Sequence, residues 1–298
     1  MLSKVPANWN IQTYLADHKI RIEKRLRELP LGKGKPTRAR EAMRYALDTP
    51  GKRFRPLLAI ATADIYQKGH LGLVLDGGVA IECIHTASLI FDDLPCMDDA
   101  HLRRGRLPTH LVYDESQAIL AAMSLIAEAN QLLSRPARER THMRLKRLEC
   151  LHRLNASFSI EGLSGGQSDD LLNKSESTLD QLEFIHAKKT GALFEACVEI
   201  PAILAEATQQ ERRWLNAFAK NLGLAFQIRD DLLDLQDSEI TGKSSKQDKV
   251  TFVELVGIEK SRALYDQLMD AALANLEAFG DSAFHLKALT RVIRKRSF

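Results

Sequence analysis

The sequence predicts an all-α protein, and three observations favour that fold class. Apolar residues recur every three to four positions along almost the whole chain, which is the spacing of an amphipathic helix. No run alternates apolar and polar residues as a half-buried strand does, and no Asn-Gly or Asp-Gly pair lies between two such runs. Glycine and proline make up 25 of the 298 residues, about 8% against roughly 12% in an average protein, so few turns are expected.

The helical pattern is strongest in six segments and breaks at glycines and prolines. The segments are 57–66, 78–91, 117–133, 178–206, 211–235 and 253–279. The breaks are Pro36, Pro50-Gly51, Pro95, Pro108, Pro136, Gly165-Gly166, Gly242 and Gly280. The basic stretch 135–147 is interpreted as a solvated helix face. No low-complexity linker or short repeat divides the chain, which favours one domain over residues 1–298.

Composition excludes several classes of protein. The chain is 45% hydrophobic and 27% charged, which argues against disorder. A net charge of +3 gives weak support for nucleic-acid binding, so no nucleic-acid partner is expected. No uninterrupted apolar stretch is long enough for a transmembrane helix, and the N-terminus lacks the apolar core of a signal peptide. The four scattered cysteines form no CxxC pair and are expected to be reduced thiols of a cytoplasmic protein.

A basic segment precedes the helix that is predicted over 57–66. The motif TPGKRFRP occupies residues 49–56, and Pro56 is well tolerated in a first helical turn. Lys52 and Arg55 lie three residues apart near the expected helix N-terminus, which attracts anions. By itself such a loop is ordinary surface, but beside the motifs described next it indicates an anion site.

The first aspartate cluster is FDDLPCMDD at 91–99, followed by HLRRG at 101–105. Asp92 and Asp98 are six residues apart, so a straight helix would separate them. Pro95 lies between them, and a proline ends or bulges a helix. Two extra residues in a bulge would bring both aspartates, with Asp93, to one cavity. The guanidinium groups that follow, Arg103 and Arg104, suit phosphate oxygens.

The second cluster is QIRDDLLD at 227–234. Asp230 and Asp234 are four residues apart and share one helix face with Gln227, while Asp231 lies beside them. Like charges at this spacing repel, and the flanks are strongly apolar, so a cation is needed for neutralisation. Clustered carboxylates suit Mg²⁺, which also binds substrate phosphates. A single acidic triplet in a helix is usually a solvated face. Two triplets of aspartates, one of them followed by paired arginines, argue against that interpretation.

Together these segments resemble the trans-isoprenyl diphosphate synthases, or polyprenyl synthetases. The resemblance covers roughly residues 40–260, and its motifs are GKRFRP at 51–56, ECIH at 82–85, LRRG at 102–105, GQ at 166–167, KTG at 189–191, GLAFQ at 223–227 and a lysine loop at 242–251. The stretch 88–106 is especially similar to bacterial geranylgeranyl and farnesyl diphosphate synthases. The resemblance implies an isoprenoid synthase fold, a single-domain helical bundle around a deep central cavity, usually as a homodimer.

The resemblance also implies roles for individual residues. About three Mg²⁺ ions would face Asp92, Asp93, Asp98, Asp230, Asp231 and Asp234, with Asp92, Asp98 and Asp230 as direct ligands. The allylic diphosphate would contact Arg103, Lys189, Thr190, Gln227, Lys243 and Lys249. Isopentenyl diphosphate would contact Lys52, Arg55, His85 and Arg104. A lone histidine is more often a core residue, but a helical wheel puts His85 on one face with Ser88 and Asp92.

The implied reaction is head-to-tail prenyl transfer. Metal ions and cationic side chains stabilise pyrophosphate as the allylic C–O bond breaks, and the double bond of isopentenyl diphosphate attacks the carbocation. A proton is then lost to the pyrophosphate, and closure of the 239–250 loop would exclude water. No side-chain nucleophile is required, in agreement with the lack of a Ser-His-Asp or Cys-His arrangement in the sequence.

Product length should depend on the floor of the cavity beneath Asp92. In the family, bulky aromatic residues four and five positions earlier stop elongation at fifteen carbons. Ser88 and Ala87 are small, which favours the twenty-carbon geranylgeranyl product, although a helical wheel points Ala87 away. Departures from the family pattern that could alter rate or chain length are Phe91, Ala100-His101 and Ala122-Met123.

Other readings stay open. A farnesyl diphosphate synthase would stop at fifteen carbons. A non-catalytic partner subunit of a synthase heteromer generally lacks intact aspartate motifs, and a terpene cyclase typically lacks the site formed here by Lys52, Arg55 and His85. An inactive structural helical protein would show no magnesium-dependent diphosphate binding.

Overall fold

The computed structural model describes residues 9–31, 35, 37–67, 70–135, 141–172, 178–241 and 250–295, with side chains in the helix over 209–241 described as far as Leu235. In these ranges the chain folds into helices joined by turns, with one isolated β-bridge between Arg103 and Arg106. The N-terminal half contains α1 (Ile11–Arg27), α2 (Arg38–Leu47), α3 (Phe54–Ala63), α4 (Leu71–Asp92), α5 (Thr109–Tyr113), α6 (Glu115–Ser134) and α7 (Thr141–Phe158). The C-terminal half contains α8 (Leu163–Leu171), α9 (Leu179–His186), π-helical turn η1 (Ala187–Gly191), α10 (Ala192–Leu204), α11 (Gln209–Thr241), α12 (Phe252–Val256), α13 (Ile258–Asn275), 3₁₀ segment η2 (Glu277–Ala283) and α14 (Phe284–Arg294). The predicted all-α fold class is confirmed.

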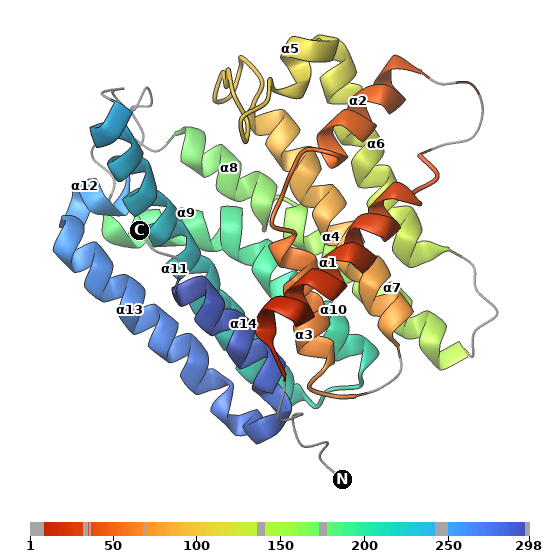
Figure 1. Ribbon diagram of the computed structural model, residues 1–298, viewed down its shortest axis with the longest axis vertical. Helices are drawn as coiled ribbons and strands as arrows, with labels where there is room; N and C mark the ends of the chain where they lie inside the picture. The colour runs from red at the N-terminus through yellow and green to blue at the C-terminus, as the bar shows by residue number, and fades with distance from the viewer. Residues whose placement is uncertain are drawn as a thin grey trace.

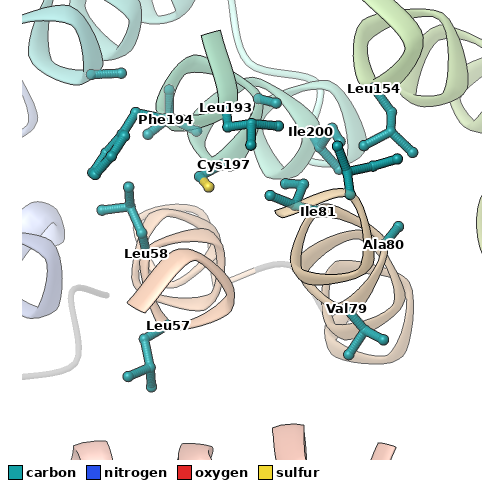
Figure 2. Packing of buried hydrophobic residues seen from close by; sticks show 14 of the residues in the cluster. Leu57, Leu58, Val79, Ala80, Ile81, Leu154, Leu193, Phe194, Cys197 and Ile200 are labelled. Carbon is teal, nitrogen blue, oxygen red and sulfur yellow. The ribbon is translucent and has the colours of Figure 1, made fainter. Parts of the chain in front are cut away.

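Helices α4 and α10 form the centre of the molecule. Figure 1 shows them enclosed by the other helices, with α11 and α13 along one side and α6 and α7 along the other. Both central helices are apolar around most of their circumference, as expected for buried helices. Figure 2 shows Ile81 of α4 and Leu58 of α3 directed toward Cys197 and Ile200 of α10. Burial on all sides therefore fixes the axis of α4, whose C-terminal end carries the first aspartate cluster.

Two glycines allow the close approach of helices to α4. A Cβ atom at Gly77 would lie 2.8 Å from the side chain of Ile200, and one at Gly78 would lie 3.1 Å from the Cα atom of Pro56. Glycine in a helix interior costs about 1 kcal/mol relative to alanine. The tight packing of α3 and α10 against α4 offsets that cost and fixes the position of the 49–56 segment.

The predicted helices are present with changed bounds at their ends. The predictions over 57–66, 78–91, 117–133 and 211–235 correspond to α3, α4, α6 and α11. The break at Gly280 is confirmed by its positive φ of 55°. The predicted breaks at Pro36, Pro136 and Gly242 lie outside the described residues.

Three expectations require correction. The segment 253–279 is not one helix, because Gly257 has φ 83° and separates α12 from α13. The segment 178–206 contains the π-helical turn η1 between α9 and α10. Gly165 and Gly166 lie inside α8 and do not end a helix. A Cβ atom at Gly166 would lie 2.3 Å from the backbone nitrogen of Lys189, so close packing against η1 explains this glycine.

One described helix, α4, is long and apolar enough to cross a membrane by length and composition. The mean hydropathy of its 18-residue window is 1.5, and 72% of that window is buried within the protein. Central helices of globular domains satisfy the same criterion, so the finding is weak evidence for a membrane span. The prediction that no segment spans a membrane stays a prediction.

Candidate active site

The first aspartate cluster lies where α4 ends. The helix stops at Asp92, and the backbone N–H of Asp98 donates to the carbonyl oxygen of Asp92 at 2.9 Å. The N–H of Asp99 donates to the carbonyl oxygen of Leu94 at 3.1 Å, and Leu94 is buried beneath the turn. A connection of six residues therefore replaces the four of a regular helix. This is the predicted bulge, which returns Asp98 to the last turn of α4.

Asp93 points to Arg103. Its carboxylate is 5% exposed, and its Oδ1 atom accepts hydrogen bonds from Nε of Arg103 at 2.8 Å and from Nη2 at 2.5 Å. The structure thus joins a predicted metal-facing residue to a predicted substrate-binding residue. A guanidinium has donors on all three nitrogens, so pairing through Nε and Nη2 does not use the donors of Nη1.

The second cluster also contains one buried aspartate that is hydrogen-bonded within the protein. Asp231 is 8% exposed. Its Oδ2 atom accepts from the backbone N–H of Phe252 at 3.0 Å, and its Oδ1 atom accepts from Nε2 of Gln227 at 3.0 Å. Asp231 therefore ties α11 to α12. The side chain of Asp230 stays 43% accessible, 3.5 Å from Arg229, and Asp234 is exposed.

A cavity of about 830 Å³ contains most of the predicted diphosphate-binding residues. Its wall includes Lys19 of α1 and Ile293 of α14, so residues far apart in the sequence meet there. The predicted site residues that line it are Lys52, Arg55, His85, Arg103, Arg104, Thr190, Gln227 and Asp230.

The large cavity adjoins two others. A cavity of about 130 Å³ shares Arg55, His85 and Thr190 with it and is also lined by Lys189 and Asp92. A groove of about 390 Å³ between α4 and α8 shares further lining residues with the smaller cavity, namely Ser88, Asp92, Leu163 and Gln167. These shared walls bring the C-terminal end of α4 and the part of α11 that carries Asp230 to one system of cavities.

The cationic side chains of this system are partly stripped of water. Burial lowers the pKa of the Arg55 and Arg104 guanidinium groups. Burial lowers the pKa of His85 well below its ordinary value, and neighbouring Arg55 lowers it further. The buried Nε atom of Arg55 has no hydrogen-bond partner among the described residues. Guanidinium donors in the wall of a cavity are suited to an anion.

Lys189 and Thr190 lie in the π-helical turn η1, a type of helix distortion that is frequent at functional sites. The Nζ atom of Lys189 lies 2.6 Å from Oδ2 of the buried Asp170 on α8. The hydroxyl of Thr190 donates to Oε1 of Gln227 on α11 at 3.2 Å. The turn therefore holds both side chains between α8 and α11.

The carboxylates of the two clusters are electrostatically costly. Burial is the main cause that raises the pKa of Asp92, Asp230 and Asp231 to about 6 in each case. Repulsion from Asp98 adds to the shift of Asp92, and repulsion from Asp234 adds to that of Asp230. A divalent cation would remove this cost, and an all-oxygen donor set fits Mg²⁺.

No three His, Cys, Asp or Glu side chains of the described residues are grouped closely enough to hold a metal ion by themselves. Magnesium usually takes one or two protein carboxylates and completes its shell with water and phosphate oxygens. The separated clusters therefore fit ions that are shared with a diphosphate.

Four remaining predictions have different outcomes. Lys243 and Lys249 lie outside the described residues. Ser88 lines both the smaller cavity and the groove. Ala87 is 1% exposed in the hydrophobic core and lines none of the three cavities.

Sequence reasoning did not single out Asp170 or Arg53. Asp170 follows the Gly-Gln motif at 166–167, and this proximity was the available signal. Arg53 lies within the motif at 49–56, but sequence alone does not separate a ligand-binding cation from one that pairs internally. The structure shows Arg53 to be 4% exposed and bound to protein oxygens.

Comparison with known proteins agrees with this geometry. A sequence model described as polyprenyl synthetase matches residues 36–282. A geranylgeranyl diphosphate synthase of Cyanophora paradoxa is 35% identical over 99% of this chain and 100% of its own length. The crystal structure of an FPP/GFPP synthase from Zymomonas mobilis has a TM-score of 0.85 and 37% identity, over 95% of this chain and 98% of that one.

A geranyltransferase of Helicobacter pylori, whose crystal structure is described as complexed with magnesium and isoprenyl diphosphate, has a TM-score of 0.83 and 31% identity. That match covers 98% of this chain and 100% of the other. The chain therefore belongs to the polyprenyl synthetase family, the trans-isoprenyl diphosphate synthases, and is a trans-prenyltransferase.

Proposed function

We propose that this prenyltransferase condenses isopentenyl diphosphate with an allylic diphosphate (dimethylallyl, geranyl or farnesyl) to give geranylgeranyl diphosphate and pyrophosphate. The observation that carries the proposal is the system of cavities in which Asp92 and Asp230, from the two aspartate clusters, share walls with basic side chains, including a buried guanidinium nitrogen that has no hydrogen-bond partner among the described residues. That nitrogen is the Nε atom of Arg55.

The predicted diphosphate-binding residues divide between two diphosphates. Lys52, Arg55, His85 and Arg104 all line the large cavity and would bind isopentenyl diphosphate. Arg103, Lys189, Thr190 and Gln227, together with Lys243 and Lys249, would bind the allylic diphosphate. Lys189 lines the smaller cavity beside Asp92, where it would meet the departing pyrophosphate oxygens.

About three Mg²⁺ ions would be held mainly by Asp92, Asp98 and Asp230, with Asp93, Asp231 and Asp234 around them. When bound, the ions would neutralise charge that develops on the leaving diphosphate. The hydrogen bonds of Asp93 and Asp231 within the protein support an orienting part for these two carboxylates. The positions of Asp92 and Asp230 in the cavity walls support direct ligation, and the side chain of Asp230 stays 43% accessible.

The product length rests on the wall beneath Asp92. Ser88 is small and lines both the smaller cavity and the groove, which leaves room for a growing chain. Leu163 and Met97 make the groove largely apolar and would exclude water from the carbocation. The alternative is a farnesyl diphosphate synthase, whose chain would end at fifteen carbons.

The test supplies dimethylallyl or farnesyl diphosphate with isopentenyl diphosphate and Mg²⁺, and separates the products by chain length. Geranylgeranyl diphosphate from both primers is expected. Farnesyl diphosphate as the sole product from every primer would overturn the twenty-carbon proposal. Turnover of the allylic diphosphate without isopentenyl diphosphate would favour a cyclase. A lack of turnover with intact diphosphate binding would favour a non-catalytic partner subunit.

We further propose that the protein acts as a homodimer. Exposed large apolar side chains gather on α5, α6 and the turn before them, where they support burial by a second copy. They are Leu107, Leu111, Val112, Ile119, Leu120 and Met123. Leu120→Asp should shift the mass measured by light scattering from dimer to monomer, whereas Leu148→Asp on α7, which is also exposed, should not.

Two further properties complete the proposal. Residues 1–298 act as one polyprenyl synthetase domain, which the contribution of Lys19 on α1 and Ile293 on α14 to the same cavity supports. The protein works in the cytoplasm without a nucleic-acid partner. The buried state of Cys83, Cys150 and Cys197 as free thiols is compatible with a reducing compartment.

A further inference from the structure

We infer that Arg53 is a positioning residue that fixes the isopentenyl diphosphate site without touching the substrate, an inference that rests on the proposed function. Arg53 lies between Lys52 and Phe54, immediately before α3, and is 4% exposed. Its backbone has φ 49° and ψ 39°, the left-handed region that is unfavourable for a residue with a side chain. Such a conformation persists where the surroundings over-determine it.

The surroundings are a set of oxygens from three helices or their ends. Nε of Arg53 donates to Glu23 on α1 at 2.8 Å, and Nη1 donates to Glu82 on α4 at 3.0 Å. Nη2 donates to the carbonyl oxygens of Leu47 at 2.6 Å and Thr49 at 3.2 Å, at the end of α2. Every guanidinium nitrogen thus has a protein acceptor, so the group is held in place as a fork.

Arg53 shares the wall of the large cavity with Lys52 and Arg55. The nitrogens of Arg53 already donate to protein oxygens, whereas the buried Nε atom of Arg55 has no partner among the described residues. The anchored guanidinium therefore sets the backbone from which Lys52 and Arg55 extend. Arg53 contributes the geometry of the site, and its neighbours contribute the donors.

The contact between Arg53 and Glu82 also bears on the position of His85. Glu82 is three residues before His85 on α4, so both lie on neighbouring positions of one helix face. Glu82 is 3% exposed, and its partner Arg53 compensates the buried charge. The Arg53–Glu82 pair consequently fixes the distance between the basic loop and the helix turn that carries His85.

Arg104 also packs closely against the loop over 49–56. A Cβ atom at Gly51 would lie 2.7 Å from Nη1 of Arg104 and 3.1 Å from Nη1 of Arg53. Two guanidinium groups therefore pass close to the backbone at Gly51. The position of Arg53 thus also limits where Arg104, another predicted ligand of isopentenyl diphosphate, can lie.

The test compares Arg53→Gln, Arg53→Lys and Glu82→Gln in the full-length enzyme with Mg²⁺ and farnesyl diphosphate. If Arg53 acts as a positioning residue, Arg53→Gln and Glu82→Gln each raise the KM for isopentenyl diphosphate at least tenfold. The KM for farnesyl diphosphate changes less than twofold, and the double variant is no worse than either single variant. Arg53→Lys gives little rescue, because an ammonium group cannot replace the fork.

The matched control is Arg25→Gln, which removes another α1–α4 ion pair, Arg25 Nε to Asp76 Oδ1 at 2.7 Å, outside the cavity. Its KM for isopentenyl diphosphate should match that of the wild type. A direct substrate ligand at Arg53 predicts the opposite pattern, since Glu82→Gln would leave that KM unchanged or lower it and Arg53→Lys would retain affinity. Either of these results would overturn the inference.

Hydrogen exchange of the backbone amides over 49–56 separates this inference from the proposed function, because it needs no turnover. Faster exchange in Arg53→Gln and Glu82→Gln, but not in Arg25→Gln, is expected even if the enzyme uses different substrates. Unchanged exchange in both loop variants would overturn the inference. If Arg53→Gln does not fold, Glu82→Gln and Arg53→Lys carry the same comparison.

Discussion

Arg103 donates two hydrogen bonds to the same oxygen of Asp93, at 2.8 Å from Nε and at 2.5 Å from Nη2. The pair closes the turn that follows α4 and joins the first aspartate cluster to the basic motif after it. The guanidinium of Arg103 is the main side-chain compensation for a carboxylate that is 5% exposed.

Arg103→Gln should therefore destabilise the fold as well as reduce activity. Leaving the buried carboxylate of Asp93 without its charged partner should lower the free energy of unfolding by roughly 1–3 kcal/mol. Chemical denaturation measures the change. The control Lys24→Gln breaks the exposed pair with Glu28, at 3.8 Å, and should cost less than about 0.5 kcal/mol. Equal effects of the two substitutions would contradict the structural part of this prediction.

Asp230→Asn should raise the melting temperature of the magnesium-free protein while abolishing activity. Burial raises the pKa of Asp230 to about 6, so its charged form opposes folding at pH 7.5. The folded state binds the proton more tightly than the unfolded state, whose pKa is near 4. Stability from this group is therefore full below pH 4 and is lost as pH rises through 6.

The measurement for Asp230 is the difference in melting temperature between the variant and the wild type from pH 4 to 8. The difference should grow with pH and level off above 7. Asp281→Asn makes the same chemical change at an exposed position and should give no such trend. A flat difference for Asp230→Asn would show that its charge is not desolvated.

Ser88→Tyr should shorten the product from twenty to fifteen carbons, because the ring would fill the smaller cavity beneath Asp92. Products made from dimethylallyl diphosphate and sized by chromatography provide the test. Ala87→Tyr places the same ring in the core, where Ala87 is 1% exposed, and should instead lower the free energy of unfolding by about 1–3 kcal/mol. Unchanged products from Ser88→Tyr would mean that residues of another helix, and not residue 88, limit the chain length.

Asp170→Asn should raise the KM for the allylic diphosphate and leave that for isopentenyl diphosphate unchanged. The reason is that Asp170 holds Lys189 at 2.6 Å beside the cavity that Asp92 lines. The adjacent Asp169 forms a looser, more exposed pair with Lys188 at 3.9 Å and provides the matched control. Steady-state kinetics of Asp169→Asn should resemble the wild type, and a similar effect of both substitutions would rule out a specific part for Asp170.

The sequence by itself determined the elements and the chemistry that they carry. Helical periodicity predicts α3, α4, α6 and α11, because burial of one or more faces imposes a repeat of 3.6 residues. The spacing around Pro95 predicts the long turn that returns Asp98 to Asp92. The mixture of carboxylates and basic residues predicts ions and diphosphates as ligands, since each of these side chains is costly to bury alone.

Only the tertiary structure decided which of these charged groups compensate one another. Asp93 pairs with Arg103, and Asp231 accepts from the backbone of Phe252. Arg53 turns inward to Glu82, while one nitrogen of Arg55 has no partner in the part of the chain that the structure describes. Sequence spacing cannot separate these cases, because the partners come from different helices and are chosen by how the helices pack. Once packing removes water, each charge must find a nearby partner inside the protein or remain poised for a ligand.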